Sequence, residues 1–163
     1  MPEISCKIEH KAVYICTLVQ IIKLNKTTLK YELDLDFVLL AITAPLKDYR
    51  LCFKINKQLN FDFSRIDELE LIFNSVSAPV YYSRYLYLHP QTDTEFNLIA
   101  NKGTGGLLIP EMKTVDFFVL IRNYIDEDEL KSFISALNKI PEIQVAVEVD
   151  PKKLKSKENL IFQ

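Results

Sequence analysis

The last third of the chain carries the pattern that most constrains the fold: a strand, a capped helix and a second strand in direct succession. Residues 115–122 predict a strand that places Val115, Phe117, Val119 and Ile121 on one face. Asp126 then stands at the N-cap position of a helix, with Glu129 placed for a capping box and Pro141 ending the helix. The apolar stripe of this helix consists of Leu130, Phe133, Ile134, Leu137 and Ile140. With residues 143–149 as the second strand, such a unit normally crosses over to a parallel strand, so we expect a C-terminal βαβ crossover.

The rest of the chain shows strand patterns and one further helix. Side chains alternate cleanly over residues 29–35, whereas the apolar run 37–43 fits either a buried strand or a helix. Asp48 is a natural N-cap for a helix that we expect to run to about Leu59. Further strands are expected at residues 69–73, 80–88 and 96–100, the last two joined by a hairpin loop at 90–94. Together these elements predict an α+β fold with a mixed, mostly antiparallel sheet and two principal helices packed on one face.

The length of the chain, 163 residues, suits one domain with its own core. We expect a single α+β domain over residues 27–163 and a peripheral extension over residues 1–26. The apolar stretch 12–22 is too short to span a bilayer, which takes about 20 apolar residues. It is also preceded by glutamates where a signal peptide would be basic. An extra strand or a short buried helix is the alternative to an extension, and we expect a cytoplasmic protein without a membrane segment.

Charge, cysteine and histidine content argue against several kinds of site. The formal net charge is −2, from 20 basic and 22 acidic side chains, whereas proteins that hold nucleic acid are usually basic. The three cysteines, Cys6, Cys16 and Cys52, lie far apart and fit free thiols, with Cys52 expected in the core. Neither His10 nor His89 has a partner at metal-ligand spacing. We therefore expect no metal, no cofactor and no strong nucleic-acid binding.

Residues 109–118 contain the most specific motif of the chain, Ile-Pro-Glu at 109–111 followed by Val115, Asp116 and Phe117. The motif resembles the signature of a small bacterial family that is named after it, the IPExxxVDY family, with Phe117 in place of the tyrosine of the name. The likeness extends over about residues 29–162 and includes Asp48-Tyr49-Arg50-Leu51, Asn101-Lys102 and the tail that starts at Asp150. The resemblance implies the fold and a bacterial cytoplasmic setting, and it carries over no catalytic or binding residues.

The two acids of this motif, Glu111 and Asp116, allow a structural and a functional interpretation. On a strand, Asp116 shares a face with Phe118, so its carboxylate is expected to be partly buried and must be paired or protonated. In the structural interpretation the two acids form a polar latch that fixes a crossing of the chain through Arg or Lys partners, while Pro110 restricts the chain entering the strand. In the functional interpretation they are acids for general acid/base catalysis in unlike environments. We favour the latch, because residues 102–106 (Lys-Gly-Thr-Gly-Gly) are typical of a turn and no catalytic partner accompanies the acids.

The predicted strand at 80–88 places Tyr81, Tyr85 and Tyr87 on one face and Arg84 on the other. Aromatic side chains on an open sheet can stack on bases, but such a face is more often covered by helices. Since Arg84 points away from the tyrosines, its charge is poorly placed to follow a nucleic-acid backbone, and we expect no tight binding.

The sequence favours a non-enzymatic cytosolic module that binds a macromolecule, with a protein as the expected partner, over an enzyme. The alternative is a small enzyme or ligand-binding domain with a site built from Glu111, Asp116, Arg50 and tyrosine side chains. Asp48 and Pro110 are further candidates for a structural or functional role. Weak RNA binding through the tyrosine face is the third alternative. A closed core at these residues would favour the module, and a polar pocket would favour the ligand site.

Overall fold

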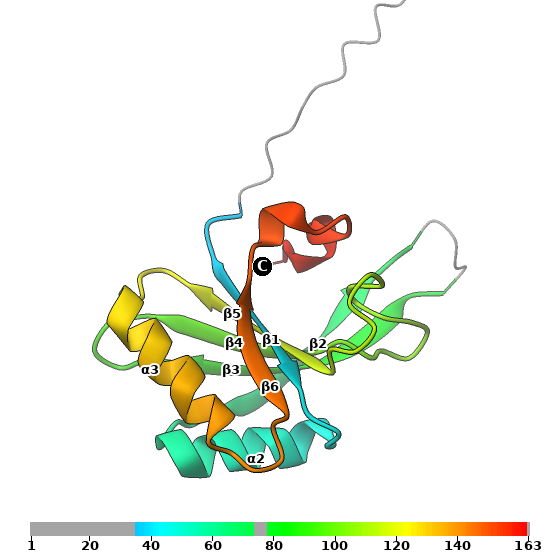
Figure 1. Ribbon diagram of the computed structural model, residues 1–163. Coiled ribbons are helices and arrows are strands. Elements are labelled where there is room, and N and C mark those ends of the chain that lie inside the picture. Colours follow the sequence, from blue (N-terminus) through cyan, green and yellow to red (C-terminus); the bar gives the residue numbers. More distant parts are fainter. Residues whose placement is uncertain (1–34, 74–77, 163) are drawn as a thin grey trace, which may run out of the picture. The chain divides into compact units, whose positions relative to one another are not determined.

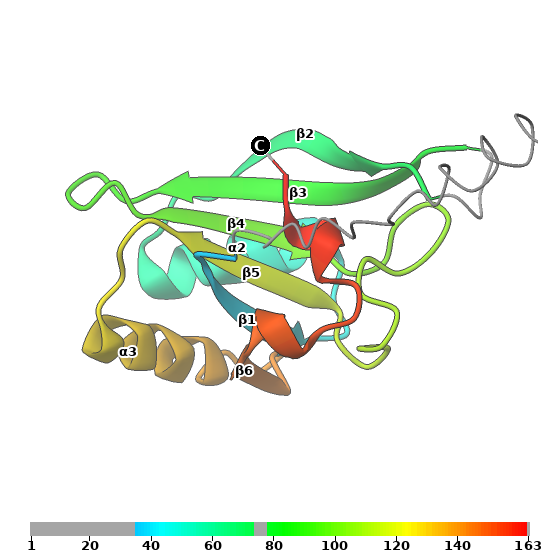
Figure 2. The ribbon, with the colours of Figure 1, turned by 90° about the horizontal axis from the view of Figure 1, so that it is seen from above.

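The computed structural model describes residues 35–73 and 78–162 of the chain. Its strands form one sheet of six in the order β2-β3-β4-β5-β1-β6, which Figure 2 shows from top to bottom. Every neighbouring pair of these strands is antiparallel, which confirms the predicted α+β fold with a mostly antiparallel sheet. The elements are β1 (Val38–Thr43), α2 (Asp48–Leu59), β2 (Ser64–Leu71), β3 (Val80–Leu88), β4 (Glu95–Ala100), β5 (Phe117–Arg122), α3 (Glu127–Asn138) and β6 (Val145–Val149).

The apolar run at 37–43 forms β1, which lies between β5 and β6 and pairs with both. Ala41, for example, stands opposite Phe118 on one side and Val147 on the other. Both faces of the sheet are covered at β1, so its side chains are apolar without alternation and give no strand period. Since β5 and β6 both run antiparallel to β1, they are parallel to one another. The expected βαβ crossover through α3 is therefore present, but it spans β1 instead of joining neighbouring strands.

Helices α2 and α3 pack on one face of the sheet, and Figure 1 shows both below it. They bury Leu51, Cys52 and Ile55 from α2 and Leu130, Phe133 and Leu137 from α3. Asp126 caps α3 as predicted, because its carboxylate accepts hydrogen bonds from the N–H groups of Asp128 and Glu129. The prediction that Asp48 caps α2 is wrong: Lys47 occupies the N-cap position and Asp48 is the first helical residue. The Asp48 carboxylate turns instead toward β3, where hydroxyl groups hold it.

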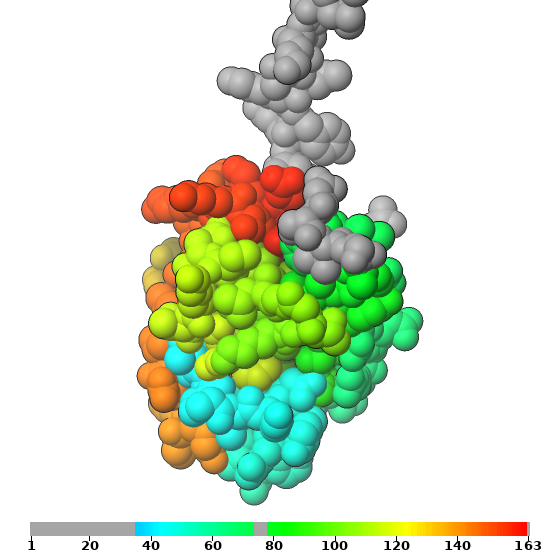
Figure 3. Space-filling model, turned by 90° about the vertical axis from the view of Figure 1, so that its right-hand side faces the viewer, coloured from blue at the N-terminus to red at the C-terminus, as the bar shows by residue number. Residues whose placement is uncertain are grey.

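Irregular chain covers the opposite face of the sheet. The segment between β4 and β5 and the C-terminal segment bury Leu108, Ile109, Val115, Leu154 and Leu160 there. The C-terminal segment contains two short 3₁₀ helices, Pro151–Lys153 and Lys157–Leu160. Asp150 caps the first of them by accepting a hydrogen bond from the Lys152 N–H. Figure 3 shows the two segments side by side on the surface, the C-terminal one in red and the other in yellow-green.

The observed boundaries match the predicted ones closely for α2 and β3 and differ by two residues at the start of β5 and of β6. The largest difference is at β2, which begins at Ser64 and not at residue 69. A β-bulge between Ile66 and Leu69 interrupts the alternation of side chains there, so the first half of the strand has no clear period.

Some predictions fall on parts of the chain that the structure does not describe. The peripheral extension at 1–26 and residues 29–34 of the predicted strand 29–35 lie outside the described residues. The domain boundary near residue 27 therefore stays a prediction. In residues 35–73 and 78–162, no helix has the length and apolar character needed to cross a membrane.

Candidate functional site

A polar cleft of about 570 Å³ lies at the start of α2, where the chain leaving β1 meets the ends of β4 and β5 (Figure 3, cyan against yellow-green). It is lined by Pro45, Leu46, Lys47, Asp48, Arg50, Ser83, Ala100, Lys102, Asp116 and Phe117. Three predicted residues, Asp48, Arg50 and Asp116, thus come together, whereas Glu111 lies elsewhere. The lining has three cationic side chains and two carboxylates, which gives it a net charge of +1.

Asp116 ties together the ends of the strands beside the cleft. Its Oδ2 accepts a hydrogen bond from the Ala44 N–H (3.0 Å), just past β1, and its Oδ1 accepts one from the Lys102 ammonium group (2.8 Å), just past β4. The Asp116 N–H also donates to the Ile42 carbonyl, and its carbonyl accepts from the Asn101 N–H. The side chain is 17% exposed, against 65% for Lys102. Asp116 has the lysine partner that the latch interpretation requires, but most of its partners are main-chain groups.

Asp48 is held by hydroxyl groups of β3. The Tyr85 hydroxyl donates to Asp48 Oδ2 (3.2 Å), and the Ser83 hydroxyl donates to the same carboxylate. Burial alone raises the pKa of Asp48, but hydrogen bonds from Ser83, the Tyr49 N–H and Tyr85, with the charge of Arg65, outweigh it and hold the pKa below its ordinary 3.8. Burial and then the negative Asp48 raise the pKa of Tyr85 to about 12. Asp48 is therefore ionised at neutral pH and is a weak proton acceptor.

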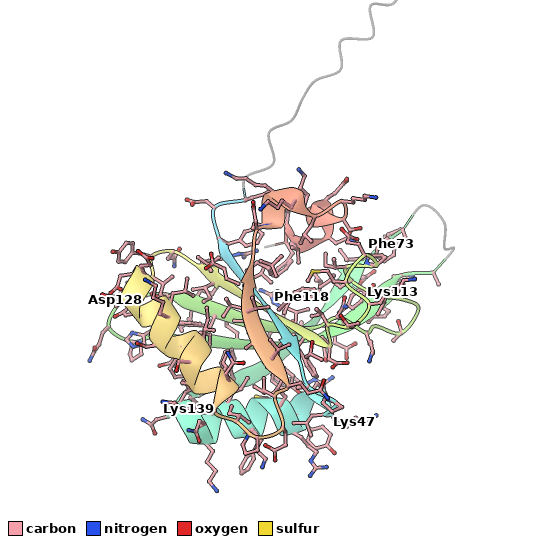
Figure 4. All side chains as sticks on the ribbon, in the orientation of Figure 1. Lys47, Phe73, Lys113, Phe118, Asp128 and Lys139 are labelled. Atoms are coloured by element: carbon pink, nitrogen blue, oxygen red, sulfur yellow. The ribbon has the colours of Figure 1, made fainter. Side chains whose placement is uncertain are left out.

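The cations of the cleft are less engaged than its carboxylates. Lys47 and Arg50 are exposed, and neither forms an ion pair with a described residue. Arg50 does act on Glu142, whose pKa is lowered mainly by a hydrogen bond from Lys54 and least by the charge of Arg50. Figure 4 shows Lys47 at the start of α2 and Lys139 at the end of α3.

Glu111 lies outside the cleft and holds the C-terminal segment. Its Oε1 accepts hydrogen bonds from the N–H groups of Lys155 (2.7 Å) and Ser156 (2.9 Å), and its Oε2 accepts one from the Ser156 hydroxyl (2.9 Å). Burial alone raises the pKa of Glu111, but these hydrogen bonds outweigh it and bring the pKa below its ordinary 4.5. The expectation of an Arg or Lys partner for Glu111 is wrong, because main-chain N–H groups and a hydroxyl occupy its oxygens.

Asn101 organises the segment between β4 and β5, a role that the sequence did not predict. Its buried Nδ2 donates to the carbonyls of Met112 (3.0 Å) and Val115 (2.8 Å), and its Oδ1 accepts from the Ile109 N–H (2.9 Å). Pro110 is the second residue of a turn that the Met112 N–H closes on the Ile109 carbonyl, a position that suits its fixed φ. Asparagine before Lys-Gly is typical of any turn. The local sequence therefore does not predict that the Asn101 side chain hydrogen-bonds the segment between β4 and β5.

The three tyrosines of β3 share the predicted face, but they do not form an open surface. Tyr85 is 5% exposed and lies under α2. Tyr87 stacks on Phe61, with ring centroids 4.3 Å apart, and Tyr81 is 36% exposed. Arg84 lies on the opposite face, beside the C-terminal segment. Because two of the three rings are covered, the face lacks the free ring surfaces that base stacking requires.

The fold and the cleft define an α+β domain with a small, polar and positively charged candidate site. Comparison with protein-family models, with curated proteins and with solved structures found no match to the chain. Among the residues that the structure describes, no three His, Cys, Asp or Glu side chains are grouped so that they could hold a metal ion. Buried Cys52 has its pKa raised to about 11, first by burial and then by the charges of Asp48 and Asp62, so it is a thiol at neutral pH.

Proposed function

We propose that the protein is a non-enzymatic ligand-binding domain whose polar cleft takes a small anion, recognised through a carboxylate or phosphate group. The observation that carries the proposal is the unequal state of the charges in the cleft. Asp48 and Asp116 already accept hydrogen bonds from within the protein, whereas Lys47 and Arg50 have no ion-pair partner among the described residues. An incoming anion therefore meets cationic donors and no unengaged carboxylate.

The side chains and the size of the cleft support this ligand class. The guanidinium group of Arg50 offers paired N–H donors that match a carboxylate or a phosphate, and the ammonium groups of Lys47 and Lys102 add positive charge. The volume of about 570 Å³ lies within the range of small-molecule sites, roughly 300–1,000 Å³.

Two features of the cleft support binding without catalysis. The lowered pKa of Asp48 makes it a poor general base at neutral pH. The Ser83 hydroxyl donates directly to Asp48, and no histidine lines the described cleft to activate it.

The ligand proposed here is a small molecule, whereas the sequence favoured a macromolecule as the partner. The tyrosine face proposed for a macromolecule is largely covered, while the cleft is open and polar. Membership of the IPExxxVDY family and a cytoplasmic location remain part of the proposal. The family rests on the motif at residues 109–117, and the location rests also on the widely spaced cysteines and the lack of a signal-peptide pattern before residues 12–22.

Isothermal titration calorimetry with inorganic phosphate and with succinate tests the proposal. Arg50→Gln should weaken binding of the better anion about tenfold, because a hydrogen bond to a charged group contributes about 1.5–3 kcal/mol and the cleft is open to water. Lys47→Gln should weaken it less, since an ammonium group on a flexible stem is easily replaced by water.

Lys139→Gln is the matched control, because it removes one exposed cation from the end of the other helix (Figure 4). Its affinity should equal that of the wild-type protein. Binding that falls equally in the Arg50 and Lys139 variants would show a general charge effect. Absence of binding by both anions, or full affinity in Arg50→Gln, would refute the proposal.

A further inference from the structure

A second cavity, of about 360 Å³, lies between α3, the loop joining β3 to β4 and the chain that leaves α2. It shares no lining residue with the polar cleft. Its wall is aromatic, with Phe61, Phe96 and Phe133, and its polar groups include His89, two threonines and Glu129. The chemistry of this cavity therefore differs from that of the anion site.

Three phenylalanine rings hold a fixed arrangement along the wall. Phe61 stacks on Phe133, with centroids 5.6 Å apart and 12° between the planes. Phe96 meets Phe133 at 5.3 Å and 58°. Phe96 and Phe133 are buried in the core that the helices form with the sheet, so their positions are set before any ligand arrives. Such a preorganised aromatic wall favours a planar aromatic ligand.

A chain of hydrogen bonds beside these rings determines which nitrogen of His89 carries the proton. The Thr94 hydroxyl donates to the Tyr124 carbonyl (2.6 Å), because a carbonyl oxygen can only accept. The Thr92 hydroxyl lies 2.7 Å from that of Thr94 and must donate to it, since Thr94 has no second proton. In the remaining contact, 3.1 Å from Thr92 Oγ1, the Nδ1 of His89 must therefore be the donor.

One contact competes with this assignment. The Gln91 N–H also points at His89 Nδ1 and would require the other tautomer, but at 3.4 Å it is the longest of the four contacts. The hydroxyl chain is shorter at every step and ends on a carbonyl, so it sets the tautomer. Nε2 is then the nitrogen with the lone pair, and no described residue donates to it.

We propose that this cavity is a second ligand site, for a neutral planar aromatic molecule that carries a hydroxyl or N–H donor. The ligand ring packs against the phenylalanine wall, and its donor pairs with Nε2 of His89. The carboxylate of Glu129, which also lines the cavity, disfavours an anionic ligand, so the two sites select different molecules. The volume lies near the lower end of the range for ligand pockets, roughly 300 Å³, which suits one or two fused rings better than a peptide.

Fluorescence titration with 2-naphthol and 2-methoxynaphthalene tests this site. The chain has no tryptophan, so each probe can be excited where the protein does not absorb. The two probes share the rings and the oxygen, but only 2-naphthol has a donor. We expect both to bind and 2-naphthol to bind about fivefold more tightly, the effect of one hydrogen bond to a neutral acceptor.

His89→Phe keeps a ring at the cavity but removes the acceptor nitrogen. It should abolish the preference for 2-naphthol and leave the affinity for 2-methoxynaphthalene nearly unchanged. An undiminished preference in this variant would refute the role of His89.

Ala136→Leu fills the cavity from α3 and should weaken the binding of both probes at least about tenfold, because the leucine side chain occupies the space that the ligand needs. Ser135→Leu adds the same side chain at an exposed position of α3 that does not line the cavity, and it should bind both probes normally. Thermal unfolding checks each variant, and Ser132→Leu, also in the lining, replaces Ala136→Leu if that variant does not fold. Failure of both probes to bind the wild-type protein, or binding that survives the filling substitution, would overturn the proposal.

Discussion

Replacing Asp116 with alanine removes the carboxylate that joins the ends of β1 and β4. The Ala44 N–H, in a fully buried residue, then loses its acceptor, and the Lys102 ammonium group loses its partner. The two losses differ in size, because one donor is buried and the other is mostly exposed.

The main-chain donor accounts for most of the expected destabilisation. A buried N–H that loses a charged acceptor costs about 1.5–3 kcal/mol. The ion pair adds about 0–1 kcal/mol, since the Lys102 side chain is 65% exposed and water screens the pair. Together the two contributions predict that Asp116→Ala lowers the free energy of unfolding by about 1.5–4 kcal/mol.

Two further variants separate the hydrogen bond from the ion pair in urea unfolding followed by circular dichroism. Asp116→Asn keeps an oxygen that can accept from the Ala44 N–H, so it should lower the free energy of unfolding by about 1 kcal/mol or less. Lys102→Gln removes only the ion pair and should cost no more than about 1 kcal/mol. If the free energy of unfolding of Asp116→Ala lies within about 0.5 kcal/mol of the wild-type value, the carboxylate is not a structural latch and our reasoning is wrong.

Four further outcomes follow from the contacts. Tyr85→Phe should cost about 1 kcal/mol in urea unfolding and, by NMR titration, raise the pKa of Asp48 toward 3.8, because the hydroxyl that favours the carboxylate is gone. Since the pKa values of Asp48 and Glu111 are lowered in the folded state, their stabilisation is full above their ordinary values of 3.8 and 4.5. This stabilisation is lost as the pH falls through the pKa values of the two carboxylates in the folded protein, and urea unfolding measured at decreasing pH should show the loss. Glu111→Gln should speed hydrogen exchange of the Ser156 amide roughly fivefold, because a neutral amide keeps only one acceptor. With the other two cysteines replaced by serine, a thiol reagent should label Cys52 only as fast as the protein unfolds, since the thiol is buried and its pKa is about 11.

The elements that the sequence predicted well depend on neighbouring residues alone. The alternation of β3, the apolar stripe of α3 and the cap at Asp126 each involve contacts within one element. Hairpin pairing of β3 with β4 follows from their short loop. The place of β1 between β5 and β6 depends on pairing with strands more than 70 residues away, and a strand buried on both faces has no period to mark it.

The same distinction holds for the candidate site. Asp48 and Arg50 share the first turn of α2, but only the sheet topology brings them beside Asp116. Glu111 and Asp116 are five positions apart in one motif, yet the turn at Pro110 sends Glu111 to the C-terminal segment and leaves Asp116 at the cleft. Contacts of this kind depend on where distant segments cross, so residue types and spacings could not assign them.

Amide chemical-shift mapping of the isotope-labelled protein with inorganic phosphate tests the anion site most directly. We predict that the amides of Ala44, Lys47, Arg50 and Lys102 shift together along one binding curve, while the amide of Thr94 in the second cavity stays in place. Shifts spread over exposed lysines elsewhere, without a common curve at the cleft, would contradict the account.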